Sequence, residues 1–319
     1  MEYKSSVLQD NSQSWYFVDL EDSRLNIIPS NTTVVDVNNV NRIITGGGAI
    51  SDNGSNLVTL FEILTTSGYD ETKIIRDHNQ AKANRFMMLP TDWINFEITC
   101  YLDFMDTNPN SSVELFGRSG RHINGRSYEG TKYDLVVTAD GHLKGNIKHF
   151  HSGGLEFLQD NAVFGDLEGQ RVGIKFIVYN NSNEPNPTAV RIEGMVDRFA
   201  DNIWEKAYEY TDTGTKNIYL KHGDETTNMI TWGGPIVGIR VIDFPSGGLA
   251  IDKLSVRSID ALAPKIVIPP IPAVFDPEAV SPPVAPPSTT YRTDLLDEYD
   301  DDIYELPSWG DPGDNAPPP

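Results

Sequence analysis

The most constraining feature of this chain is an unbroken alternation of apolar and polar residues from Trp93 to Phe104. The apolar set is Ile94, Phe96, Ile98, Cys100, Leu102 and Phe104, and the residues between them are Asn95, Glu97, Thr99, Tyr101 and Asp103. Side chains on a β-strand alternate between its two faces, so this segment predicts a long strand with one buried face. The same pattern predicts that Cys100 is an inert thiol in the core.

Similar patterns predict further strands at 171–179, 190–197, 204–210, 235–243 and 248–258. Segment 57–66 is the one plausible helix, although its β-branched residues also suit a strand. Segment 76–85 is polar and is expected to be a loop. Because the strands do not alternate with helices, we predict an all-β fold of two stacked antiparallel sheets, a sandwich or jelly roll.

Composition divides the chain into three zones. Residues 1–35 are polar and predict an edge strand or an N-terminal arm, and residues 36–262 predict the sandwich. Residues 263–319 form a proline-rich, acidic tail that cannot build a core of its own. The tail is either a solubilising segment or a peptide that docks on a partner. Its candidate docking anchors are Tyr299, Tyr304, Leu306 and Trp309.

Net charge and hydropathy narrow the classes of partner. A formal net charge of −21 argues against binding nucleic acid or resting on an anionic membrane. No apolar run approaches the roughly 20 residues of a membrane span, which argues against membrane insertion. The N-terminus shows no signal peptide. We expect a protein of the extracellular surface or of a virion, in a larger assembly with glycan or neighbouring subunits as partners.

The segment from Arg118 to His151 carries a local positive charge. It holds four of the six histidines, and its six Lys and Arg against three Asp and Glu give 6 − 3 = +3. A basic region on an acidic protein is a candidate site for an anionic or polyhydroxylated ligand. Ordinary strands with solvated outer faces are the alternative. The candidate glycan-binding residues are Arg118, Arg121, His122, Tyr133, Lys148, His149 and His151.

Two weaker signals lie further along the chain. Asp197, Asp201 and Asn202 cluster in one short loop whose oxygen atoms suit a structural calcium ion, although a plain Asx-rich turn has the same composition. Trp232, before Gly-Gly-Pro, is a candidate for stacking on a sugar ring or, alternatively, a structural plug at the start of a strand. No cofactor is required by any motif.

The order of several segments resembles concanavalin A-like jelly-roll proteins, in particular uncharacterised surface or secreted proteins of marine microbes. These segments are TSGYDETKI (66–74), TDWINFEITCYLDF (91–104), ELFGRSGRH (114–122), LEGQRVGIKFIVYN (167–180), VRIEGMVDRFADNIWEKAYEYTD (190–212), ITWGGPIVGIRV (230–241) and IDKLSVRSI (251–259). The resemblance implies a lectin- or glucanase-type sandwich. We therefore expect a non-catalytic surface or virion-type structural protein that binds glycan or partner subunits. The alternative is a polysaccharide lyase that uses segment 118–151.

Overall fold

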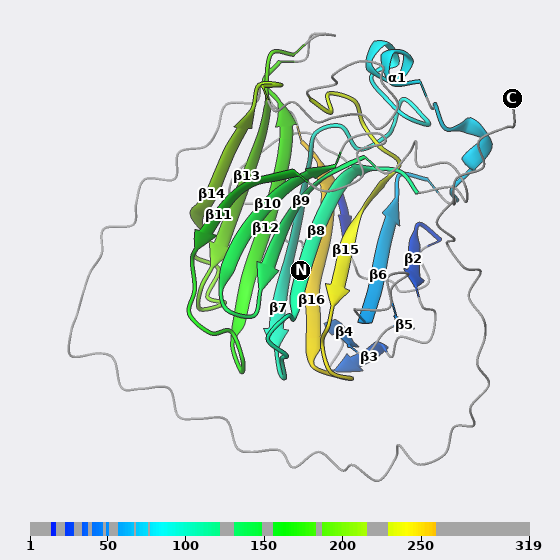
Figure 1. Ribbon diagram of the computed structural model, residues 1–319. Coiled ribbons are helices and arrows are strands. Elements are labelled where there is room, and N and C mark those ends of the chain that lie inside the picture. Colours follow the sequence, from blue (N-terminus) through cyan, green and yellow to red (C-terminus); the bar gives the residue numbers. More distant parts are fainter. Residues whose placement is uncertain are drawn as a thin grey trace, which may run out of the picture.

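The structure is a computed structural model of the chain. It describes residues 14–16, 23–28, 34–37, 40–46, 49–50, 57–66, 68–75, 77–121, 131–148, 156–182, 187–215 and 229–259. Within these ranges nearly every regular element is a strand, and the strands form two antiparallel sheets stacked face to face (Figure 1). The predicted all-β, jelly-roll sandwich is confirmed.

Each sheet has seven strands in a continuous order and an eighth strand beside them. Sheet A runs β14 (Glu205–Asp212), β13 (Val190–Asp197), β12 (Arg171–Asn180), β7 (Phe96–Phe104), β16 (Leu249–Ser258), β4 (Val40–Thr45) and β3 (Val34–Val37), with β1 (Ser14–Tyr16) also on β16. Sheet B runs β11 (Glu156–Ala162), β10 (His142–Lys148), β9 (Lys132–Thr138), β8 (Ser112–Ser119), β15 (Ile236–Ile242), β6 (Leu57–Leu64) and β2 (Leu25–Ile28), with β5 (Ala49–Ile50) also on β6.

The core lies between the two sheets and follows the alternation seen in the sequence. On β7, Phe96, Ile98, Cys100, Leu102 and Phe104 are fully buried in the main cluster. The Cys100 thiol is free and buried, as predicted, and burial raises its pKa well above the ordinary value. Because one face of each strand packs inward, the other face of sheet A carries the polar residues of the same strands.

The sheets approach closely where a glycine of one faces an aromatic ring of the other. A Cβ atom built on Gly145 of β10 would lie 1.9 Å from the Tyr208 hydroxyl oxygen of β14. A Cβ atom on Gly117 of β8 would lie 2.1 Å from the Phe96 ring of β7. Glycine is required at both positions because any larger residue would overlap a ring in the packed core.

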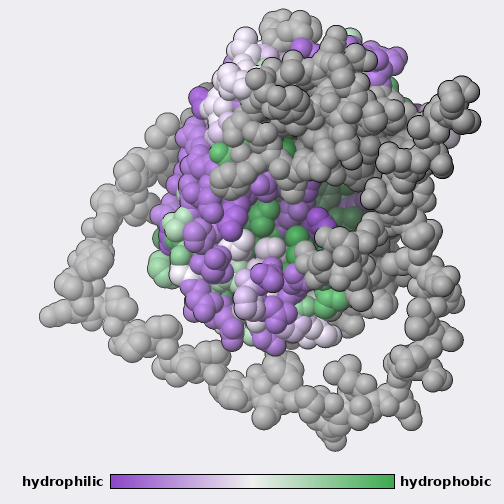
Figure 2. Space-filling view, viewed as in Figure 1, coloured by the Kyte–Doolittle hydropathy of each residue, from purple (hydrophilic) through white to green (hydrophobic). Residues whose placement is uncertain are grey.

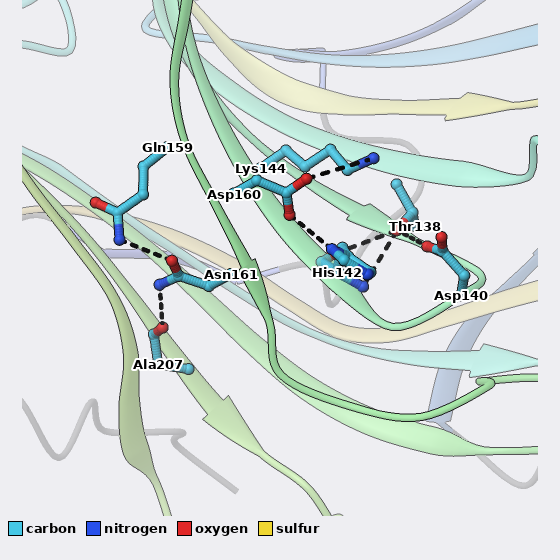
Figure 3. A network of polar contacts seen from close by, with 8 residues as sticks. All are labelled: Thr138, Asp140, His142, Lys144, Gln159, Asp160, Asn161 and Ala207. Atoms are coloured by element: carbon cyan, nitrogen blue, oxygen red, sulfur yellow. Dashed lines mark hydrogen bonds and ion pairs between the residues drawn. The ribbon is translucent and has the colours of Figure 1, made fainter.

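Polar contacts join the edges of the sandwich beside β11 (Figure 3). The Asn161 amide of sheet B donates to the Ala207 carbonyl of sheet A at 2.9 Å, so the two edge strands are linked directly. Next to it, His142 Nδ1 lies 2.7 Å from an Asp160 carboxylate oxygen, and these residues come from paired strands β10 and β11. These contacts stabilise the edge of the fold, where the sheet has no further strand to pair with.

One local expectation is wrong and one alternative is settled. Segment 57–66 forms strand β6, as its β-branched residues suggested, and not a helix. Segment 76–85, expected to be a loop, contains helix α1 (His78–Asn84). The Asp77 carboxylate caps α1 by accepting the Gln80 N–H at 2.7 Å, and Arg85 ends it at a φ of 70°. The 3₁₀ turn η1 (Glu71–Lys73) precedes α1.

The polar N-terminal zone contributes strands to both sheets. β1 pairs with β16 of sheet A, and β2 pairs with β6 of sheet B. The edge-strand alternative therefore describes these residues. Within the described ranges, no helix is long and apolar enough to cross a membrane.

A buried carboxyl in the turn before β7 predicts a specific pH dependence. Asp92 is 5% exposed and accepts the Met88 N–H at 2.8 Å, and burial raises the pKa of Asp92 to about 7. An unfolded aspartic acid has a pKa of about 3.9, so the folded protein holds an extra proton between these values. The stabilisation that comes from protonated Asp92 in the folded protein is fully present below pH ~4 and is lost as the pH rises towards 7.

We expect Asp92→Asn to remove this dependence, because asparagine can still accept the Met88 N–H but does not ionise. Urea unfolding at several pH values should show the variant gaining stability over the parent protein as the pH rises from about 4 to 7. A free-energy difference that stays constant over this window would contradict the assignment.

Candidate functional site

Arg118, the first of the predicted glycan-binding residues, lies inside the protein. Its side chain is fully buried, and its backbone has a φ of 53° at the end of β8. The guanidinium donates to the carbonyl oxygens of Ile94, at 2.8 Å, and Ile230. Burial lowers the pKa of Arg118 to about 10, so the group is still charged at neutral pH. Arg118 therefore joins the segment before β7 to the segment before β15, which corrects its assignment to a ligand surface.

Tyr133 and Trp232 require the same correction. Tyr133 is fully buried, and its hydroxyl donates to an Asp212 carboxylate oxygen at 2.6 Å and accepts the Ile230 N–H at 3.2 Å. Burial and the neighbouring Asp212 raise the pKa of Tyr133 well above its usual value. Trp232 is 1% exposed and belongs to the main core, which matches the structural-plug alternative.

Among the remaining candidates of the basic segment, the structure describes the side chain of Arg121. Arg121 is partly exposed on sheet B, where it forms an ion pair with Glu62 and lies 4.8 Å from the centre of the Tyr69 ring. The side chain of Lys148 and the whole of His122, His149 and His151 lie outside the described residues. A lyase that uses segment 118–151 could therefore not use Arg118 or Tyr133 of that segment, because both side chains are enclosed by protein.

The predicted calcium-binding residues form a hydrogen-bonded turn. The buried Asp197 carboxylate accepts the Tyr101 hydroxyl at 2.9 Å and the N–H groups of Asp201 and Asn202 at 3.1 and 2.7 Å. Asp201 accepts the Ile203 N–H at 3.0 Å. Both oxygens of Asp197 are therefore occupied by protein donors. No group of three or more His, Cys, Asp or Glu side chains suited to a metal occurs in the described parts of the chain.

We expect the thermal stability of the protein to be independent of calcium. A calcium ion at this turn would have to displace the hydrogen bonds that Asp197 already accepts, so chelation should remove nothing from the fold. Thermal melts in EDTA and in millimolar calcium should coincide. A melting temperature that rises with calcium, and does not rise in Asp201→Ala, would instead establish a calcium site.

The turn organises a longer loop between β13 and β14, residues 198–204, which we call the β13–β14 loop. Ala200 and Asn202 adopt positive φ angles of 54° and 71°. Arg198 anchors the start of the loop by donating to Glu205 and to the Val163 carbonyl. At the other end, the Trp204 Nε1–H donates to the Asn202 side chain at 3.1 Å. Hydrogen bonds within the loop and to its flanking residues Asp197, Glu205 and Val163 therefore brace it at both ends.

This fixed loop exposes two large apolar residues. The exposed fraction is 82% for Phe199 and 63% for Ile203, the highest values among large apolar side chains of the described residues. Figure 2 shows a mostly hydrophilic described surface over the left-hand strands of Figure 1, with small apolar patches. Sequence reasoning missed this feature, although the pattern DRFADNIW does place two apolar residues within a polar turn.

Beside the loop lies the outer face of sheet A, the face turned away from the core. The ring of Trp204 covers part of it, 4.2 Å from Lys175 Nζ and 5.9 Å from the ring of Tyr101. Lys175 is fully buried, and its Nζ lies 4.0 Å from Glu97. Burial, with Arg257 nearby, lowers the pKa of Lys175 to about 8.

The carboxylates of this outer face are held by neighbouring donors. Glu97 accepts the Thr99 hydroxyl at 3.0 Å and the Arg257 guanidinium at 3.2 Å. Glu193 accepts the Tyr179 hydroxyl at 2.7 Å. Lys175, Glu97 and Glu193 are at most 2% exposed, so these contacts are internal and brace the sheet beneath the β13–β14 loop. We therefore take the exposed β13–β14 loop as the candidate site.

Comparison with known proteins shows only distant structural likeness. No family model matches the sequence, and no curated protein matches it. The carbohydrate-binding module CBM66 from Bacillus subtilis has 11% identity, covers 72% of this chain and 92% of that chain, and gives a TM-score of 0.35. The CBM2 module of the evolved Dit protein of Lactobacillus casei BL23 phage J-1 has 9% identity, with 78% and 97% coverage and a TM-score of 0.41.

A prokaryotic β-1,3-1,4-glucanase (lichenase) derived from a mouse hindgut metagenome also has 9% identity, covers 78% of this chain and 99% of that chain, and gives a TM-score of 0.41. Scores this low carry no argument about function. The fold assignment therefore rests on the two sheets themselves, and the expected relation to surface proteins of marine microbes has no support from these comparisons.

Proposed function

We propose that the protein is a non-catalytic glycan-binding β-sandwich of a cell surface or virion. The observation that carries the proposal is the β13–β14 loop, which is braced by hydrogen bonds and exposes Phe199 to solvent. Exposing a large apolar side chain to water is unfavourable, and a rigid loop loses little entropy when a ligand covers it. The loop therefore has the properties of a prepared binding surface.

Carbohydrate is the ligand class that fits the surroundings of Phe199. A sugar ring presents an apolar face of C–H groups and a rim of hydroxyls, and aromatic rings bind such faces while nearby polar groups bind the hydroxyls. Asp201 and Asn202 lie in the same loop and are exposed. Phe199 and these polar neighbours together offer both kinds of contact.

The proposal is tested by applying the purified protein to an array of neutral and acidic polysaccharides and measuring the positive ones by calorimetry. We expect saturable binding to at least one glycan class, with no release of reducing ends or unsaturated uronate products. A protein that binds no member of the array is not a glycan-binding module. Product formation would make it an enzyme.

Docking of the acidic tail on partner subunits is a second part of the proposal. Tyr299, Tyr304, Leu306 and Trp309 lie outside the described residues, and their role rests on the sequence pattern of apolar anchors among acidic residues. A chain truncated after Ala263 retains every described strand. It should fold with an unchanged melt but fail to join the assembly. Assembly of the truncated chain at the normal level would exclude tail docking.

A further inference from the structure

The basic side chains around the β13–β14 loop indicate the charge of the ligand. β13, the loop and β14 contain three basic residues, and each has a carboxylate partner. Arg191 lies 3.3 Å from Glu209, and Arg198 pairs with Glu205. Lys206 Nζ lies 3.1 Å from Glu209 and 3.5 Å from Glu193. A ligand carboxylate or sulfate would have to compete with these partners for each cation.

The net charge of the same region also disfavours an anionic ligand. Residues 190–212 contain three Arg and Lys against six Asp and Glu, so 3 − 6 = −3. The exposed Asp201 carboxylate lies two residues from Phe199 in the same loop and adds a negative charge there. A polyuronate or sulfated glycan would therefore be repelled, whereas the hydroxyls of an uncharged sugar could donate to Asp201.

From these contacts, and resting on the proposed glycan binding, we infer that the ligand of the β13–β14 loop is a neutral glycan that stacks the apolar face of a ring on Phe199. This site differs from the cation-rich site expected at 118–151, because the three basic residues of 190–212 already pair with carboxylates of the protein. Ile203 is the second exposed apolar residue of the same loop.

The test measures two probe sets by calorimetry at low and at high sodium chloride. The neutral set contains hexasaccharides of β-glucan and xylan, and the anionic set contains oligogalacturonate and oligomannuronate. We expect a neutral oligosaccharide to bind with a dissociation constant that does not change with salt, because no ion pair forms. Phe199→Ala should weaken this binding about tenfold or more, the usual effect of removing a central aromatic contact.

Leu57→Ser provides the matched control, since Leu57 is a 37% exposed apolar residue on sheet B, away from the loop. It should leave the dissociation constant unchanged, and thermal melts of both variants should confirm that they fold. Binding of anionic probes only, with an affinity that falls steeply with salt, would overturn the inference but leave glycan binding intact. Neutral binding that Phe199→Ala does not weaken would place the site elsewhere. No binding of any probe would reject the proposed function itself.

Discussion

Replacing Arg118 by alanine should destabilise the protein by about 3–5 kcal/mol, because two buried carbonyl groups lose their donor at about 1–3 kcal/mol each and a cavity is left. The substitution leaves the carbonyl oxygens of Ile94 and Ile230 without their donor in a region closed to water. It also removes the cation near the Tyr133–Asp212 pair and leaves a cavity where the guanidinium lay. Urea unfolding monitored by tryptophan fluorescence gives the free-energy change.

Arg191→Ala is the matched control for that experiment. Arg191 is an arginine with a polar partner too, but its side chain is 40% exposed and its salt-bridge partner Glu209 is 44% exposed. Exposed pairs of this kind contribute about 0–1 kcal/mol, so this variant should unfold almost like the parent. If Arg118→Ala proves as mild as the control, Arg118 does not have the buried structural role assigned to it.

The second large effect is expected at Gly145. In Gly145→Ala the new methyl group would overlap the Tyr208 hydroxyl and ring, which have little room to move because Tyr208 is 1% exposed between the sheets. Overpacking of a well-packed core typically costs about 1–3 kcal/mol, and we expect a loss near the upper end because an aromatic ring yields less than an aliphatic chain.

Tyr208→Leu tests whether that clash is the cause. The single variant should lose stability through the cavity it creates. In the double variant the alanine methyl group occupies part of that space, so the combined loss should be smaller than the sum by about 0.5–3 kcal/mol. Strictly additive losses would show that Gly145 is required for its backbone and not for the approach of Tyr208.

Sequence periodicity predicted the sandwich well because burial repeats along each strand. The alternation at 93–104 placed Cys100 in the core, and the patterns at 171–179 and 190–197 matched β12 and β13. Helix α1 was missed because its sequence, HNQAKAN, is polar and short. The capping Asp77 was a usable signal, since aspartate before a helical turn is a common N-cap.

The site was harder to predict because its determinants are contacts between residues distant in the sequence. Arg118 looked like part of a basic surface, but its partners Ile94 and Ile230 lie 24 and 112 residues away. A local count of charges cannot show which cations are already enclosed or paired. Phe199 and Ile203 were similarly indistinguishable from core residues, because their exposure follows from the turn that Asp197 holds.

The position of β15 and β16 also determines the order in which the fold can be completed. β15 lies between β6 and β8, and β16 lies between β4 and β7, so the N-terminal strands join each sheet only through these two late strands. A chain emerging from the ribosome can form the meander of β8, β9, β10 and β11 early. The edge of β6 that will pair with β15 has no partner until residues 236–242 have been synthesised. Pairings this far apart in sequence form slowly. The unpaired edges of β6 and β8 are exposed during that interval, and this is when a chaperone would bind or misassembly would begin.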